Sequence, residues 1–136
     1  MPIRLVVADD HVEFRADLHL LLKPQPLFVI EGETDDADEA VLLAQRLQPD
    51  LLLLDIRFKQ SSGLNAIPLI RAVSPGTRIL MVSLQNDRRY LIRSVEAGAS
   101  GYLLKDEVGE LLLEAVETVC HGKPFYSPRV DLHGPL

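Results

Sequence analysis

Short apolar runs alternate with longer stretches of helical periodicity along most of the chain, and this alternation constrains the fold more than any other feature. The runs are nearly continuously apolar at their centres, as is typical of parallel strands covered on both faces. They begin at Ile3, Leu27, Asp50, Thr77 and Ser100. Strands that alternate with helices predict an α/β fold, in which right-handed crossovers build a parallel sheet.

The stretches between the runs repeat apolar residues every three or four positions, which predicts amphipathic helices. We expect these helices over residues 12–23, 37–47, 64–73, 88–97 and 107–121. The end of the chain holds Pro124, Pro128 and Pro135 and has no periodicity. We therefore predict one domain over residues 1–122 and a linker or tail over residues 123–136.

Composition excludes several classes of function. A chain of 136 residues is long enough for one domain and too short for two ordinary ones. Its net charge of −6 argues against unaided nucleic-acid binding, and the single Cys120 excludes an intramolecular disulfide and a cysteine-based zinc site. The opening MPIRLVVADD does not resemble a signal peptide, and no apolar stretch reaches the ~18 residues of a membrane helix. We expect a cytoplasmic protein that makes no membrane contact.

Polar residues close four of the five apolar runs. Because the carboxyl ends of parallel strands meet at one edge of the sheet, these residues are predicted to share one small cleft. They are Asp9 and Asp10 after the first run, Asp55 after the four leucines of the third, Ser83 after the fourth and Lys105 after the fifth. Taken singly, each has an ordinary explanation, such as a helix cap for the aspartate pair. Together on one edge they favour a site.

Three neighbouring carboxylates repel one another unless a cation neutralises them. A ligand set made of oxygen atoms suits a hard divalent ion, and Mg²⁺ commonly completes its shell with phosphate oxygens. Lys105 and Ser83 could then donate to a phosphoryl group, while an aspartate could accept it as an aspartyl-phosphate. We interpret His11, which follows the acid pair, as a residue at the start of a helix.

At this point the motifs match a known family. The segments VVADDH, LLLLDI with a glycine eight positions after Asp55, MVS and GYLLKD together resemble the receiver domain of two-component response regulators. The resemblance covers roughly residues 3 to 126, and GASGYLLKD followed by GKPFYSP is most similar to the NarL/FixJ (LuxR-type) subfamily. It implies a flavodoxin-like (βα)5 fold, with a parallel five-stranded sheet of order 2-1-3-4-5 and helices on both faces.

The resemblance also implies roles for individual residues. Asp55 would be the phosphoacceptor, and Asp9, Asp10 and Asp55 would hold Mg²⁺ together with the backbone carbonyl of Arg57. Asp10 would bind the ion directly and Asp9 through water.

Lys105 and Ser83 would bind the phosphoryl group, and Ser83 and Tyr102 would form the switch, in which the aromatic ring turns inward behind the moving hydroxyl. The implied phosphodonor is a sensor histidine kinase. The chain would be the receiver part of a transcriptional regulator, with a homodimer as a further expectation. DNA contact would come only through a C-terminal helix-turn-helix domain outside this sequence.

Two positions depart from the family pattern. Leu84 stands where an alanine or glycine usually follows the switch hydroxyl, and Lys59 stands where a proline is usual four positions after the acceptor. The bulk of Leu84 predicts slower phosphorylation than in a typical receiver.

The two departures also leave open a pseudo-receiver that works as an interaction or dimerisation module without phosphorylation. A phosphatase is disfavoured, because that chemistry expects two acids separated by one residue and Asp9 and Asp10 are adjacent. Nucleotide binding is disfavoured because no glycine-rich phosphate loop follows the first run. We expect a signalling module that catalyses its own Mg²⁺-dependent phosphorylation and dephosphorylation, and no turnover enzyme.

Overall fold

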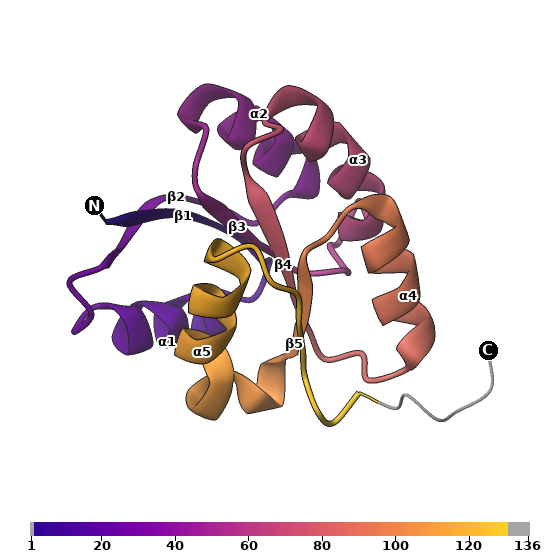
Figure 1. Ribbon diagram of the computed structural model, residues 1–136. Helices are drawn as coiled ribbons and strands as arrows, with labels where there is room; N and C mark the ends of the chain where they lie inside the picture. The colour runs from indigo at the N-terminus through magenta and orange to yellow at the C-terminus, as the bar shows by residue number, and fades with distance from the viewer. Residues whose placement is uncertain (1, 131–136) are drawn as a thin grey trace.

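A computed structural model describes residues 2–130, which form one parallel sheet with helices on both faces (Figure 1). The strands lie in the order β2-β1-β3-β4-β5-β6. In chain order the elements are β1 (Ile3–Ala8), α1 (Val12–Leu22), β2 (Phe28–Thr34), α2 (Ala37–Leu47), β3 (Leu51–Leu54), α3 (Gly63–Val73), β4 (Arg78–Ser83), α4 (Arg88–Ala97), β5 (Gly101–Leu104), the short 3₁₀ helix η1 (Lys105–Glu107), α5 (Val108–Cys120) and β6 (Phe125–Tyr126).

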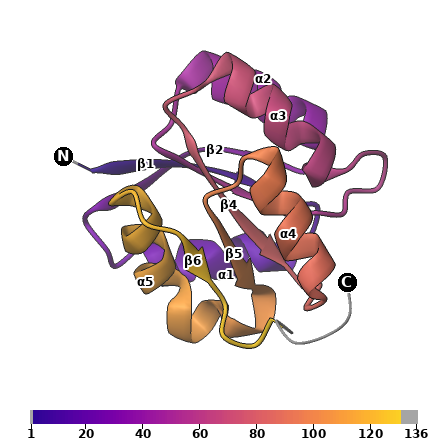
Figure 2. The same ribbon diagram turned by 45° about the vertical axis from the view of Figure 1, so that its right-hand side comes forward.

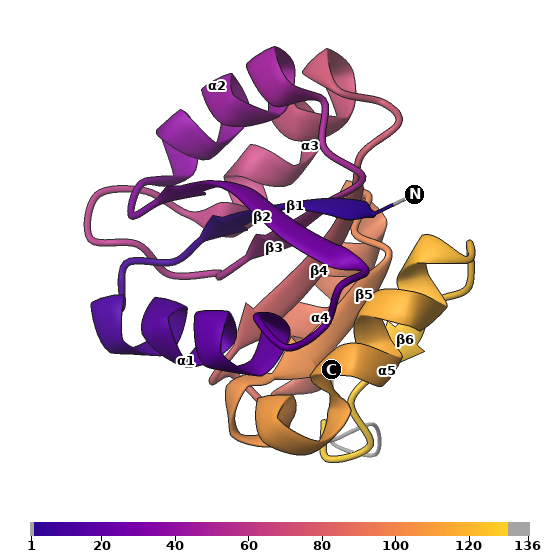
Figure 3. The same cartoon turned by 90° about the vertical axis from the view of Figure 1, so that its left-hand side faces the viewer.

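The helices are divided between the two faces of the sheet, as Figure 3 shows. Helices α1 and α5 pack on one face, where Leu18, Leu112 and Val116 join the inward side chains of the strands. Helices α2, α3 and α4 cover the other, with Ala40, Ile67 and Leu91 among the buried residues. This arrangement confirms the predicted α/β, flavodoxin-like class and the order 2-1-3-4-5 of the first five strands.

The leucine run forms the centre of the sheet. All four residues of β3 are buried, since β1 and β4 flank the strand and helices cover both faces. Leu54 is paired with Ala8 on one side and with Met81 on the other. Asp55 therefore leaves the sheet between the ends of β1 and β4, at a point fixed by the most deeply buried strand.

A sixth strand corrects the predicted strand count. Phe125 and Tyr126 pair in parallel with Gly101 and Tyr102 of β5, so the segment predicted as a linker begins inside the sheet. Ser127 and Val130, further along, are also buried. The sixth strand was not predicted because it has two residues and lies between prolines, and it forms by pairing with the edge of β5. The rest of the predicted tail, residues 131–136, lies outside the described residues.

Within residues 2–130, no helix combines the length and the apolar character that crossing a membrane requires.

Candidate functional site: three carboxylates and a lysine

Asp55 lies at the carboxyl edge of the sheet with its carboxylate almost fully buried, the side chain being 6% exposed. One oxygen accepts a hydrogen bond from the amide of Ile56 at 2.7 Å, and the other accepts one from the ammonium of Lys105 at 2.9 Å. A buried carboxylate needs such partners, because removal from water disfavours its charged form. The site holds Asp55 in a fixed orientation.

Lys105 follows β5, and its ammonium joins the ends of two strands. Besides Asp55, the Nζ atom contacts Oδ2 of Asp9 at 2.7 Å. The Phe14 ring of α1 has its centroid 4.6 Å from the same nitrogen, within the range of a cation–π contact. The lysine side chain is only 7% exposed, so it is packed into the site and does not extend into solvent.

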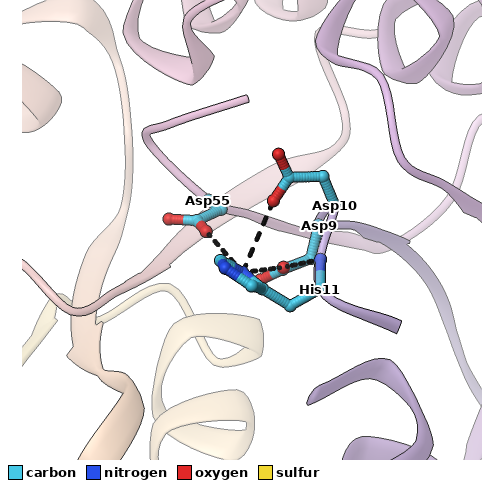
Figure 4. A group of neighbouring side chains, drawn as sticks. All are labelled: Asp9, Asp10, His11 and Asp55. Atoms are coloured by element: carbon cyan, nitrogen blue, oxygen red, sulfur yellow. Dashed lines mark hydrogen bonds and ion pairs between the residues drawn. The ribbon is translucent and has the colours of Figure 1, made fainter. Parts of the chain in front are cut away.

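The three predicted acids do converge (Figure 4). Asp9, Asp10 and Asp55 each offer a carboxylate oxygen, and these atoms, together with a nitrogen of His11, lie within 4.8 Å of one another. Asp9 is 3% exposed and Asp10 is 14% exposed. Three carboxylates beside one ammonium leave an excess of two negative charges, which matches the charge of one divalent cation.

Burial is the main influence on the ionisation of Asp55. It raises the pKa of this carboxyl above the ordinary value, and the nearby charge of Asp9 acts in the same direction. The hydrogen bond and the positive charge of Lys105 oppose this rise without cancelling it. The folded protein therefore holds the proton of Asp55 more tightly than an exposed aspartate would.

His11 immediately precedes α1, as the sequence interpretation expected, and its ring also contacts the acid cluster, which that interpretation did not include. Its Nδ1 atom lies 3.1 Å from Asp9, 3.4 Å from Asp10, 3.9 Å from Asp55 and 3.0 Å from Nζ of Lys105. Figure 4 shows the ring directed toward the three acids. The ring is 58% exposed and lies on the solvent side of the acid cluster. The only sequence signal that could have assigned His11 to the site was its position directly after the acid pair. An ordinary residue at the start of a helix can occupy the same position.

Comparison with known proteins decides the family. The family described as the response regulator receiver domain matches residues 5–117, which is most of the chain. The chain belongs to the response regulator receiver family.

Curated relatives of this receiver domain are longer proteins. It is 33% identical over 128 residues to the transcriptional regulatory protein DegU of Brevibacillus brevis, a match that covers 94% of this chain and 54% of the relative. It is 33% identical over 130 residues to the nitrate/nitrite response regulator protein NarP of Escherichia coli, covering 96% of this chain and 60% of the relative. The chain thus spans little more than half the length of these relatives.

Solved structures that are similar to this receiver domain come from the same subfamily that the sequence motifs indicated. A two-component response regulator of the LuxR family from Aurantimonas sp. has a TM-score of 0.90 and 28% identity, covering 96% of this chain and 93% of that one. The signal receiver domain of the putative response regulator NarL from Mycobacterium tuberculosis has a TM-score of 0.84 and 30% identity, covering 90% and 98%.

The two predicted switch residues of the receiver are linked through the loop after β4. The hydroxyl of Ser83 accepts a hydrogen bond from the amide of Gln85 at 3.1 Å, and the phenol of Tyr102 donates one to the carbonyl of Gln85 at 2.6 Å. The Tyr102 ring is fully buried, and this burial raises the pKa of its phenol. The Tyr102 ring thus lies inward in this structure, and its part in a switch stays a prediction.

The remaining predicted residues lie around the rim of the receiver site. Leu84 is 67% exposed directly after the buried Ser83, so its side chain lies outside the core at the end of β4. Lys59 is exposed and lines a cavity of about 280 Å³ together with Asp10 and other residues of the neighbouring loops. Arg57, in the loop after β3, pairs with Ser62, and its guanidinium donates to the Tyr90 hydroxyl at 3.1 Å. Its role as a carbonyl ligand stays a prediction.

Proposed function

We propose that this chain is a phosphorylation-dependent switch in which Asp55 accepts a phosphoryl group from a sensor histidine kinase. The observation that carries this proposal is the contact of one ammonium, that of Lys105, with both Asp55 and Asp9 at 2.9 and 2.7 Å. The contact joins the ends of three strands around two buried carboxylates, which family membership alone does not guarantee. Phosphoryl transfer depends mainly on positioning and charge neutralisation, and these groups supply both.

The acid cluster fits a magnesium ion. The converging carboxylate oxygens of Asp9, Asp10 and Asp55 are hard donors, and their excess charge equals that of the ion. These residues would hold Mg²⁺, with the Arg57 carbonyl as the further ligand that the family pattern assigns. Bound there, Mg²⁺ neutralises the carboxylates and stabilises the negative charge that develops on a transferring phosphoryl group.

The protein groups divide the transfer between them. A carboxylate oxygen of Asp55 forms the new bond to phosphorus, while the bond between phosphorus and the kinase's histidine nitrogen breaks and the histidine keeps the electron pair. Lys105 holds the acceptor in place beforehand and is within reach of an oxygen of the bound phosphoryl group afterwards. The burial of Asp55 keeps bulk water from competing at the acceptor.

The signal would be a shift between two arrangements of the carboxyl edge. The phosphoryl group adds roughly two negative charges at a fixed point. A Ser83 hydroxyl that leaves the Gln85 amide for a phosphoryl oxygen would free the loop after β4 to rearrange around the inward Tyr102 ring. Contacts made in only one arrangement bias the equilibrium by the differential free energy they supply, typically about 1–3 kcal/mol.

The proposal that this chain is part of a larger regulator rests on its relatives. Proteins named as transcriptional and nitrate/nitrite response regulators match this chain over 54–60% of their length. The chain would accordingly be the receiver part of a DNA-binding regulator that dimerises, with DNA bound by a domain outside this sequence. The pseudo-receiver alternative has no support, because the acids and the lysine are all present and in contact.

Labelling by a small phosphodonor tests the proposal. The protein is incubated with acetyl phosphate and Mg²⁺, and phosphorylated species are separated on Phos-tag gels. We expect labelling of the natural chain and of the control Asp38→Asn, an exposed acid on α2. Labelling should be lost in Asp55→Asn and after chelation of the metal. Labelling that survives Asp55→Asn, or no labelling of the natural chain, would overturn the proposal.

A further inference from the structure

Ser127 is a buried serine in the segment that the sequence predicted to be a linker, and no part of the proposed function uses it. Its side chain is inaccessible to solvent. Its amide donates a hydrogen bond to the carbonyl of Tyr102 at 2.8 Å, and its hydroxyl accepts one from the amide of Leu104 at 2.8 Å. Ser127 thereby satisfies two backbone groups of β5 on the side where β6 pairs, and within residues 2–130 no further strand pairs with β6.

These two bonds fix the end of β5 at the residues that matter for the site. Tyr102 carries the buried phenol, and Leu104 directly precedes Lys105. On the other side of the strand, Leu104 pairs with Ser83 of β4. The backbone from which Lys105 extends is therefore held between the switch serine on one side and Ser127 on the other.

The segment after α5 runs along the edge of the sheet beside β5 (Figure 2), and its side chains also pack on both faces of the sheet. Phe125 packs with the core on the α1 and α5 side, whereas Val130 packs with the core on the α4 side, which includes Tyr102. The guanidinium of Arg129 also forms an exposed ion pair with Asp106 at 3.1 Å. Three kinds of contact thus hold this segment beside η1, the turn that carries Lys105.

We infer that Ser127 is a positioning residue for phosphoryl transfer, which acts by holding the end of β5 so that Lys105 reaches Asp55 and Asp9. This inference rests on the proposed function. A lysine in solvent would adjust to a shifted backbone, but Lys105 is 7% exposed and packed against Phe14. Its ammonium must contact two buried carboxylates at 2.7 and 2.9 Å, and a displaced strand end loses one of them.

The coupling works in both directions, because linkage between two sites is reciprocal. If Ser127 improves the position of Lys105 in the phosphorylated form, then phosphorylation tightens the contact of residues 125–130 with β5. These are the last described residues of the chain, and any segment that follows them starts from this anchored strand. The strand β6 would thus form part of the switch.

Matched serine variants of the whole chain provide the test. Ser127→Ala removes the acceptor for Leu104. Ser74→Ala is the control, because Ser74 is equally buried and its hydroxyl contacts Thr77 at 2.6 Å, but it lies at the opposite end of the sheet. We expect Ser127→Ala to slow phosphorylation by acetyl phosphate about fivefold, a typical effect of one lost hydrogen bond expressed in the rate, and Ser74→Ala to lose stability at an unchanged rate.

A double-mutant cycle separates positioning from general loosening. If Ser127 acts through Lys105, Ser127→Ala has little further effect on the rate once Lys105→Ala is present. Equal slowing by Ser127→Ala in both backgrounds, or equal slowing by the Ser74 control, would overturn the inference. If Ser127→Ala does not fold, Ser127→Cys, whose sulfur is a weaker acceptor of similar size, takes its place in the same cycle. A natural chain that takes no label counts against the proposed function instead.

Discussion

Gly63 packs directly against the backbone carbonyl of Asp55: a Cβ atom on Gly63 would lie 1.8 Å from that oxygen. The amide of Gly63 also donates to the carbonyl of Ile56 at 2.7 Å, so the start of α3 is joined to the loop that carries the acceptor. The glycine eight positions after Asp55 is thus required by this close approach, since any side chain would push the loop away from the acid cluster.

Gly63→Ala should therefore destabilise the fold by about 1–3 kcal/mol, the usual cost of inserting an atom into packed structure. The colliding atom is backbone, which cannot rotate away. Gly109→Ala in α5 is the control, because its new Cβ would meet nothing within 4 Å and alanine favours a helix. Urea unfolding monitored by circular dichroism measures both changes. Equal stability of the two variants would show that the contact can relax.

Removal of the metal should lower stability through the acid cluster. With Mg²⁺ at about 100 times its dissociation constant, the natural chain should gain about 2.7 kcal/mol over the same chain in EDTA. Asp10→Asn removes a charge that repels its neighbours, so the variant should be more stable than the natural chain in EDTA and gain little from Mg²⁺. Thermal melts with and without the ion measure this difference. If Mg²⁺ still stabilised Asp10→Asn by the same amount but no longer stabilised Asp38→Asn, the ion would be bound elsewhere.

The raised pKa of Asp55 predicts a pH dependence in EDTA. Above the ordinary value of 3.8 the unfolded chain loses this proton while the folded chain still holds it, so rising pH favours unfolding. Asp55→Asn lacks this effect. Its advantage in stability over the natural chain should be absent well below pH 3.8, grow between pH 3.8 and the folded pKa, and stay constant above that pKa. Paired urea titrations across the pH range measure it, and an advantage that shrinks as pH rises would mean that Lys105 outweighs burial.

The exposed Leu84 should slow the entry of the phosphodonor. Leu84→Ala is expected to raise the rate of labelling by acetyl phosphate, because the smaller side chain opens the approach beside Ser83. Leu42→Ala on α2, which alters a similarly exposed leucine at 64% exposure, should leave the rate unchanged. Time courses on Phos-tag gels compare the three proteins. Identical rates for Leu84→Ala and the natural chain would exclude crowding.

The sequence was sufficient to predict the elements in which every residue is buried. The run Leu51–Leu54 was recognisable because a strand covered on both faces is apolar at every position, and this placed Asp55 at the edge of the core. The parallel order of the strands then predicted that Asp9, Asp10, Asp55 and Lys105 converge, and the distances in the structure agree.

The features that the sequence did not predict depend on tertiary contacts. Strand β6 has two residues and is stabilised by the edge of β5 and by the hydroxyl of Ser127, neither of which leaves a periodic pattern in the sequence. His11 contacts the acids because the backbone turns after Asp10, and its ring is largely exposed. The roles assigned to Ser83, Tyr102 and the Arg57 carbonyl stay predictions.

A crystal structure of the chain with Mg²⁺ and beryllofluoride, a mimic of the phosphoryl group, tests the central claim most directly. The proposed function predicts that the mimic is attached to Asp55, with Lys105 and Ser83 in contact with its fluorine atoms and the metal on Asp9 and Asp10. A mimic bound elsewhere, or attached to Asp55 while Lys105 stays on Asp9 alone, would contradict it.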